Sequence, residues 1–123
     1  MLKKILVWLP AVLYMALIFY LSSRPAPPAA KELPIILQMK VVHLFEYGFL
    51  SLLFYWALAN TTGLSQARCF LWAVVLTVLY GVTDEIHQLF VPTRTASFWD
   101  LVANFIGASL TQGVIFLVRR TQP

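Results

Sequence analysis

The sequence predicts an all-α integral membrane protein, a bundle of four transmembrane helices. Of its 123 residues, 60% are hydrophobic and only 11% are charged, whereas about 25% are charged in an average soluble domain. The apolar residues also gather into four segments of roughly the 17 to 25 residues that a membrane-spanning helix needs. Lipid offers no partners to free backbone polar groups, and the segments are too long and uniformly apolar for barrel strands. They are therefore predicted to be helices.

The first apolar segment covers about residues 5–21. It follows Lys3 and Lys4 and precedes a Pro- and Ala-rich stretch, an order that superficially resembles a signal peptide. Its apolar run is longer than the roughly 7 to 15 residues of a signal core. We therefore expect the segment to remain as a membrane helix, with Pro10 tolerated in its first turns.

The other apolar segments cover about residues 41–59, 69–91 and 98–118. A short polar turn at residues 60–67 joins the second segment to the third. Only residues 92–97 separate the third from the fourth, so these two helices are predicted to be antiparallel neighbours. The sequence shows no internal repeat and no separate soluble part, and residues 1–123 are predicted to form a single transmembrane domain.

The basic residues are scattered at segment ends, a pattern that suits topology signals better than nucleic-acid binding, which needs a clustered basic face, and we expect no nucleic-acid partner. With both termini in the cytoplasm, five basic residues lie inside and four outside, and this bias favours cytoplasmic N- and C-termini. The inner group is Lys3, Lys4, Arg68, Arg119 and Arg120, and the outer group is Arg24, Lys31, Lys40 and Arg94. Cys69 is the single cysteine, which excludes an internal disulfide and favours a small apolar filler.

Polar and ionisable residues converge at the predicted outer end of the bundle. The second and fourth helices begin there and the third ends there, each with polar side chains three or four residues apart on one face. The candidate ligand-binding residues are Lys40, His43, Glu46, Tyr47, Asp84, Glu85, Gln88, Arg94, Asp100 and Asn104.

These residues indicate a functional site because ionisable groups are costly in a membrane. An unpaired charge at the bilayer centre costs on the order of 3 kcal/mol, so the polar faces should point inward. Lys40 and Arg94 would then offset the acids. The alternative is a salt-bridge network of these cations with Asp84, Glu85 and Asp100 that only holds the helices in register, although desolvation makes such networks a poor source of stability.

Two stretches of this region, KVVHLFEYGFL (40–50) and DEIHQLFVPTRTASFWDLVANFIG (84–107), resemble the VanZ-like membrane proteins. The family pattern starts a helix with Lys-x-x-His-x-x-x-Tyr, continues with Asp-Glu-x-x-Gln and Pro-x-Arg, and ends with Asp and Asn four residues apart and then Gly. The matching residues are Ser22, Ser23, Lys40, His43, Tyr47, Asp84, Glu85, Gln88, Pro92, Arg94, Asp100, Asn104 and Gly107. Thr93 departs from the pattern where members often carry Gly, and Arg24 stands where Gln is expected.

The resemblance covers nearly the whole chain and implies a multi-pass protein of a bacterial cytoplasmic membrane. It also implies a link to teicoplanin resistance in the cell envelope. Teicoplanin acts on the outer face of the membrane, which agrees with the side that the basic residues assign to the polar cluster. The resemblance implies no particular reaction.

Two functions of different classes remain open. The first is a binding or transport element among the membrane lipids, which holds an anionic lipid, a glycolipid or a glycopeptide-type ligand and acts alone or as a homo-oligomer. The polar stripe of the fourth helix, which continues to Thr111, favours this function. The chain has no inverted repeat or broken helix pair, which argues against transport by one copy alone.

The second function is a membrane-embedded enzyme acting on a phosphate-bearing or lipid-linked substrate. Lys40 and Arg94 would hold the anionic group. The catalytic candidates are Asp84, Glu85 and His43, an acid serving as general base and the histidine as proton carrier. No nucleophile motif accompanies them. Oxygen ligands with one histidine would suit Mg²⁺ or Mn²⁺ better than Zn²⁺, and the metal-ligand candidates are Asp84, Glu85 and Asp100.

Overall fold

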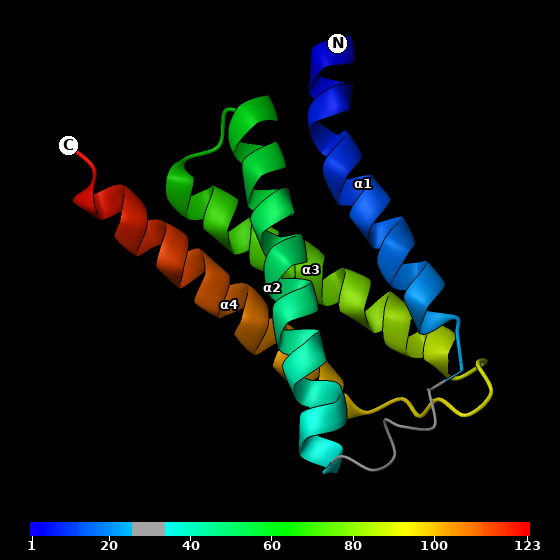
Figure 1. The fold of residues 1–123 in the computed structure, drawn as a ribbon. Coiled ribbons are helices and arrows are strands. Elements are labelled where there is room, and N and C mark those ends of the chain that lie inside the picture. The colour runs from blue at the N-terminus through cyan, green and yellow to red at the C-terminus, as the bar shows by residue number, and fades with distance from the viewer. Residues whose placement is uncertain (26–33) are drawn as a thin grey trace.

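The computed structural model describes residues 1–25 and 34–123, without the side chains of residues 35–40. Four helices make up the fold (Figure 1): α1 (Leu2–Ser22), α2 (Ile35–Thr61), α3 (Gln66–Gln88) and α4 (Phe98–Thr121). All four are long and apolar enough to cross a membrane. The part of the chain that is described contains no strand, and the predicted all-α membrane bundle is confirmed.

Helix α3 ends at Gln88, three residues before residue 91, where the sequence predicts its C-terminal end. After Gln88 the amides of Leu89, Phe90 and Val91 bond to carbonyls three residues back, at 3.2, 3.0 and 3.2 Å. This is the tighter pattern of a 3₁₀ turn. Pro92 follows, and a proline disfavours the helical conformation for the residue before it.

Other helix ends extend beyond the predicted bounds. The second helix is predicted from residue 41 but begins at Ile35, directly after Pro34 in extended conformation. The third begins at Gln66 rather than 69 because the Ser65 side chain caps its first turn by accepting from an amide. The first begins at Leu2 rather than 5, and the fourth continues to Thr121 rather than 118.

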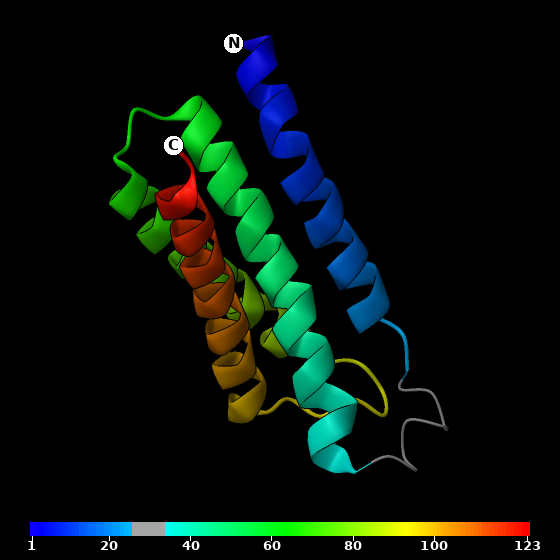
Figure 2. The same cartoon turned by 60° about the vertical axis from the view of Figure 1, so that its left-hand side comes forward.

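Helix α2 is the central element of the bundle. It contacts each of the other three helices, whereas α1 and α4 do not contact each other within the described residues. Half of the residues in its apolar span are buried, against 17% for α1. Figure 2 shows α1 running beside α2 at the edge of the bundle, and α4 on the other side of α2. Most of the α1 surface is therefore left for lipid.

Helices α2 and α4 cross at two glycines. A Cβ atom on Gly107 would collide with the backbone carbonyl of Leu44, and one on Gly48 would lie 2.9 Å from the Thr111 hydroxyl. Small residues at such positions let two membrane helices approach until their backbones touch. We call this contact, formed by Leu44, Gly48, Gly107 and Thr111, the glycine crossing.

The two ends of the bundle differ in composition. Both termini lie at one end (Figures 1 and 2), and the buried apolar cluster, which includes Phe54, Tyr55, Leu58 and Cys69, lies towards that end of α2 and α3. The end of α1, the end of α3 and the start of α4 meet at the opposite end. The polar side chains predicted to form a site are gathered there.

Candidate functional site

The polar faces predicted for the helices are turned into the bundle. The side chain of Lys40 lies outside the described part of the chain. Seven of the other candidates are buried, namely His43, Tyr47, Asp84, Glu85, Gln88, Asp100 and Asn104. Glu46 and Arg94 are half-buried. Burying so many polar groups between membrane helices is costly unless they find hydrogen-bond partners. The hydrogen-bond partners of each side chain therefore show which groups are satisfied within the protein and which are left for a ligand.

One hydrogen-bonded chain links three helices through Asp84. The Tyr47 hydroxyl of α2 donates to Asp84 Oδ2 at 2.9 Å, and Gln88, one turn later on α3, approaches the same oxygen at 3.5 Å. Gln88 Nε2 also donates to the Ser22 hydroxyl at the end of α1, at 3.1 Å. Asp84 is only 4% exposed. Its other oxygen, Oδ1, is buried and has no hydrogen-bond partner among the described residues.

A second contact joins α2 to α4. His43 Nδ1 lies 3.0 Å from Asn104 Oδ1, and the imidazole stacks on the Tyr47 ring with the centroids 5.7 Å apart. Asn104 is fully buried, and its amide nitrogen occupies the space beside Gly81, where a Cβ atom would lie 2.6 Å away. Gly81 is therefore needed for the asparagine to reach the histidine.

Three ionisable side chains form what we call the inner cluster: His43, Glu85 and Asp100. One ligand atom from each lies within 4.8 Å of the others, and all three residues are buried. Glu85 Oε2 accepts from the Ser97 amide at 3.0 Å. Asp100 lies in the first turn of α4, where the helix dipole favours a negative charge.

The inner cluster differs in one member from the predicted metal-ligand candidates. The sequence suggests Asp84, Glu85 and Asp100, but the structure groups His43 with Glu85 and Asp100. Adjacent residues on a helix point about 100° apart, so Asp84 and Glu85 face different neighbours. Asp84 faces Tyr47 and Gln88, whereas Glu85 faces the start of α4.

A cavity of about 150 Å³ lies beside Asp84, and we call it the polar cavity. Its lining combines polar and apolar side chains from all elements at this end except α4: Ile18, Leu21, Ser22, Val42, His43, Glu46, Asp84, Gln88 and Arg94. Leu21 is 45% exposed and Val42 is 57% exposed. Because these residues belong both to the lining and to the outer surface, the cavity reaches the surface beside them.

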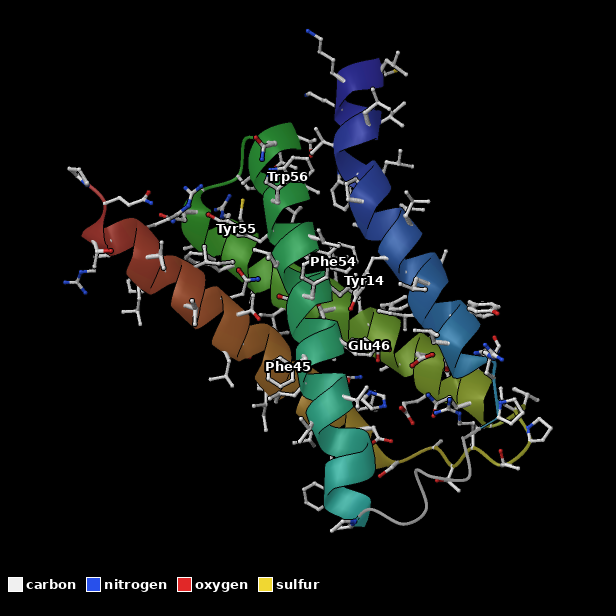
Figure 3. All side chains as sticks on the ribbon, viewed as in Figure 1. Tyr14, Phe45, Glu46, Phe54, Tyr55 and Trp56 are labelled. Atoms are coloured by element: carbon white, nitrogen blue, oxygen red, sulfur yellow. The ribbon has the colours of Figure 1, made fainter. Side chains whose placement is uncertain are left out.

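Two neighbouring residues of α2 lie on different sides of this helix. Figure 3 shows Glu46 and Tyr14 between α2 and α1, whereas Phe45 lies on the side of α2 nearer α4. Glu46 lines the polar cavity, and no described residue donates a hydrogen bond to it. Phe45 is 72% exposed and lines an apolar groove with residues of α4. The carboxylate therefore faces the cavity while the aromatic ring faces lipid.

Arg94 lines the cavity together with Glu46, on whose carboxylate its positive charge acts as predicted, and its hydrogen bonds go to backbone carbonyls. Its Nε donates to the Arg24 carbonyl at 2.9 Å, and one terminal nitrogen donates to the Leu21 carbonyl at 3.3 Å. Leu21 lies in the last turn of α1, and Arg24 follows the last residue of the helix, Ser22, by two positions. Arg94 thus fastens α1 to the loop between α3 and α4.

Sequence reasoning missed some polar partners in this bundle. Ser22 is indicated only by the family pattern, yet it bonds to Gln88. Gln112 of α4 was missed, although it donates to the carbonyl and hydroxyl of Ser51 at 3.0 and 2.7 Å. It directly follows Thr111, about a third of a turn away from the polar stripe that the sequence indicates. His87 does not line the cavity and instead stacks on Phe19 at 4.2 Å.

Comparison with known proteins agrees with the sequence pattern. The model of the VanZ/LLP1 family matches residues 7–119. An uncharacterized protein of Schizosaccharomyces pombe is 37% identical over 92 residues, which are 74% of this chain and 51% of the yeast protein. The chain thus spans about half the length of this relative. No solved structure is significantly similar to the chain.

Proposed function

The chain belongs to the VanZ/LLP1 family of membrane proteins, and from that premise we propose that it binds the headgroup of a membrane lipid in the polar cavity. One observation carries this proposal. Asp84 lines the cavity and is only 4% exposed, yet its Oδ1 has no hydrogen-bond partner among the described residues. A buried polar atom without a partner costs about 1 to 3 kcal/mol, and more when it is charged. A bound group with a hydrogen-bond donor would remove that cost.

The size of the cavity restricts the ligand. A volume of about 150 Å³ resembles that of an engineered cavity that binds benzene, so it has room for about six non-hydrogen atoms. One small headgroup fits, whereas an oligosaccharide or a whole glycopeptide is far too large. The opening at Leu21 and Val42 suits a molecule whose acyl chains stay in the bilayer while its headgroup enters the bundle.

The membrane setting forms part of the proposal. We place the protein in a bacterial cytoplasmic membrane with both termini in the cytoplasm, so that the polar cavity lies in the outer leaflet. A resistance to teicoplanin-type antibiotics would then act through the bound lipid at the outer surface, because the antibiotic itself exceeds the cavity. Assembly into a homo-oligomer is also proposed, and native mass spectra of the protein count its subunits.

The test blocks the cavity without altering its charges. Val42→Trp places a large ring at the opening, and Val41→Trp is the matched control, because Val41 is exposed on the same helix but does not line the cavity. Each protein is purified in nanodiscs and examined by native mass spectrometry. We expect the wild type and Val41→Trp to retain lipid. The amount of lipid retained by Val42→Trp should be at least about tenfold lower than that of the wild type.

Two results would contradict lipid binding. Equal retention by the two tryptophan variants would mean that lipid attaches elsewhere on the bundle. A wild type that retains no lipid in gentle conditions would remove the basis of the proposal. Thermal unfolding of all three proteins checks that the substitutions preserve the fold.

A second candidate, a metal-assisted enzyme acting on a phosphate-bearing or lipid-linked substrate, is favoured by the inner cluster. One imidazole with two carboxylates is a donor set that suits Mg²⁺ or Mn²⁺. Opposite ligands of an octahedral Mg²⁺ ion lie about 4.2 Å apart, at roughly 2.1 Å from the metal. At most one pair of three ligands can be opposite, and adjacent ligands lie about 3 Å apart. The ligand atoms of His43, Glu85 and Asp100, which lie within 4.8 Å of one another, would therefore draw closer together around an ion.

Manganese binding tests this second candidate directly. Electron paramagnetic resonance of the purified protein titrated with Mn²⁺ should show one tightly bound ion that Asp100→Asn removes. Asp84→Asn should leave the manganese signal unchanged, because Asp84 faces the polar cavity rather than the inner cluster. Loss of the signal in both variants would contradict the assignment to the inner cluster, and no bound ion in the wild type would remove the candidate.

A further inference from the structure

The polar cavity has an excess of negative charge among its described side chains. Two carboxylates, Glu46 and Asp84, line it together with one guanidinium, that of Arg94, and the imidazole of His43. With both carboxylates ionised and the imidazole neutral, the described lining has two negative groups and one positive group, a net charge of −1. An anionic headgroup would add to this imbalance, whereas a cationic one would remove it.

The hydrogen bonds indicate the same sign of charge. Two nitrogens of Arg94 already donate to the carbonyls of Arg24 and Leu21. The acceptors of the cavity are less engaged, since Asp84 Oδ1 has no partner among the described residues and none of these donates to Glu46. The cavity thus offers acceptors at Asp84 and Glu46 that described donors leave unused. A ligand that fits it brings N–H or O–H groups together with positive charge.

We infer that the headgroup bound in the polar cavity carries a primary ammonium, as in the ethanolamine phospholipids, and that Asp84 and Glu46 receive it. This inference rests on the proposed lipid binding and names the class of lipid. An ammonium offers three donors in a compact group, which can bond to Asp84 Oδ1 and the Glu46 carboxylate together. The ethanolamine group fits within the roughly six-atom space, and its phosphate lies towards the opening.

Other common headgroups match the cavity less well. A trimethylammonium group has the right charge but no N–H donor, and its extra methyl groups fill the space that the acids leave. A glycerol headgroup offers hydroxyl donors but no positive charge, so the lipid keeps the negative charge of its phosphate. Charge and donors together therefore favour the primary ammonium over both alternatives.

The experiment compares lipids within one membrane. Nanodiscs contain equal amounts of phosphatidylethanolamine, phosphatidylglycerol and phosphatidylcholine with the same acyl chains, and native mass spectrometry identifies the lipid that stays bound. For the wild type we expect phosphatidylethanolamine to be retained about tenfold over its share of the mixture, as for a charge-assisted hydrogen bond. In Asp84→Asn and Glu46→Gln this preference should fall to about the bulk ratio.

Two further variants separate recognition from folding. Gln112→Leu is the matched control for Asp84→Asn, because Gln112 is equally buried (5% against 4% exposed) and also has an oxygen without a described partner, but does not line the cavity. It should keep the preference. Glu46→Gln removes a charge that no described hydrogen bond holds, so it tests recognition even where Asp84→Asn unfolds. Lys40→Gln removes the positive charge of Lys40, near the start of α2, and tests whether the headgroup preference depends on this lysine instead of the acids.

The outcomes distinguish lipid binding from recognition of its headgroup. Retention of lipid without any headgroup preference would overturn the ammonium inference and leave lipid binding in place. A preference for phosphatidylglycerol, or one that only Lys40→Gln abolishes, would also overturn it. Binding of soluble O-phosphoethanolamine, with no lipid retained, would preserve recognition of the ammonium and overturn the lipid source, and with it the proposed function.

Discussion

Two faces of α2 meet their neighbours in different ways. At the glycine crossing, α2 and α4 approach until a single added Cβ atom would strike a backbone carbonyl. On another face of the same part of α2, the helix borders a cavity that it shares with α1 and α3, and a buried carboxylate oxygen of Asp84 is left without a described partner. Close packing of backbones requires small residues and no ligand. The polar cavity has the opposite character, since it leaves both space and an unused acceptor.

The comparison indicates which region serves stability and which serves recognition. The glycine crossing fixes how α2 and α4 lie against each other, and it thereby places His43 within reach of Asn104. The polar cavity, by contrast, keeps a charge buried at a cost to stability. Buried ionisable groups within membrane helices are typically functional for that reason.

The largest effect is expected at the glycine crossing. In Gly107→Ala the new methyl group would meet the Leu44 carbonyl, a backbone atom that moves only with its helix. We expect a loss of about 3 kcal/mol or more in the free energy of unfolding, at the upper end of overpacking effects. Unfolding in mixed detergent micelles measures this loss.

The matched control lies on the same helix. A Cβ atom added at Gly113 would have no other atom within 4 Å, so Gly113→Ala should stabilise α4 by roughly 0.5 to 1 kcal/mol through its helix propensity. Equal effects of the two substitutions would mean that α2 and α4 do not touch at Gly107, and the contrast between the two regions would fail.

An intermediate effect is expected where Tyr47 donates to Asp84. Tyr47→Phe removes the hydroxyl that bonds to Asp84 Oδ2 at 2.9 Å and leaves a buried carboxylate with fewer donors. The expected loss of unfolding free energy is about 2 kcal/mol. In the Asp84→Asn background the same substitution should cost about 1 kcal/mol less, because the lost bond is no longer charge-assisted.

Tyr55→Phe is the control for this measurement. Tyr55 is 5% exposed, but it belongs to the apolar cluster and its hydroxyl has no hydrogen bond among the described contacts. Its substitution should change the unfolding free energy by less than about 0.5 kcal/mol. A double-mutant cycle without coupling between Tyr47 and Asp84 would show that the two side chains do not interact in the membrane.

The sequence predicted the helices and their polar faces because both follow from short-range periodicity. Asp84 and Gln88 lie one turn apart on α3, and Asp100 and Asn104 one turn apart on α4, so their inward orientation was expected. Contacts between segments that are distant in the sequence could not be predicted from it. Gln88 meets Ser22 across 66 positions of sequence, and no local pattern indicates that the end of α1 closes one side of the cavity.

The same limit applies to two other residues of the site. Arg94 was expected to offset acids, and its charge does act on Glu46, but its hydrogen bonds to the carbonyls of Leu21 and Arg24 join segments that are distant in the sequence. His43, rather than Asp84, completes the inner cluster because the angle at which α2 crosses α4 sets the direction of the imidazole. Composition and spacing identify candidate side chains, whereas helix crossing angles decide which of them meet.

The smallest predicted effect lies in the loop that carries Arg94. Thr93 has a φ of 67°, the one positive value at a non-glycine position among the described residues. The left-handed conformation costs a residue with a Cβ roughly 1 to 2 kcal/mol, and β-branched residues adopt it least readily. Glycine removes this strain but loses more entropy on folding. Thr93→Gly should therefore stabilise the protein by about 0.5 to 1 kcal/mol, measured by thermal unfolding in micelles.

This substitution also tests whether the loop belongs to the recognition region. Thr95→Gly is the control, since Thr95 is exposed in the same loop without a positive φ, and it should destabilise slightly. If Thr93→Gly raises stability and leaves lipid retention unchanged, the conformation at this position concerns the hairpin alone. If Thr93→Gly destabilises the protein, the contacts of the threonine side chain stabilise the loop by more than the backbone strain destabilises it. The position of Arg94 at the cavity would then depend on those contacts.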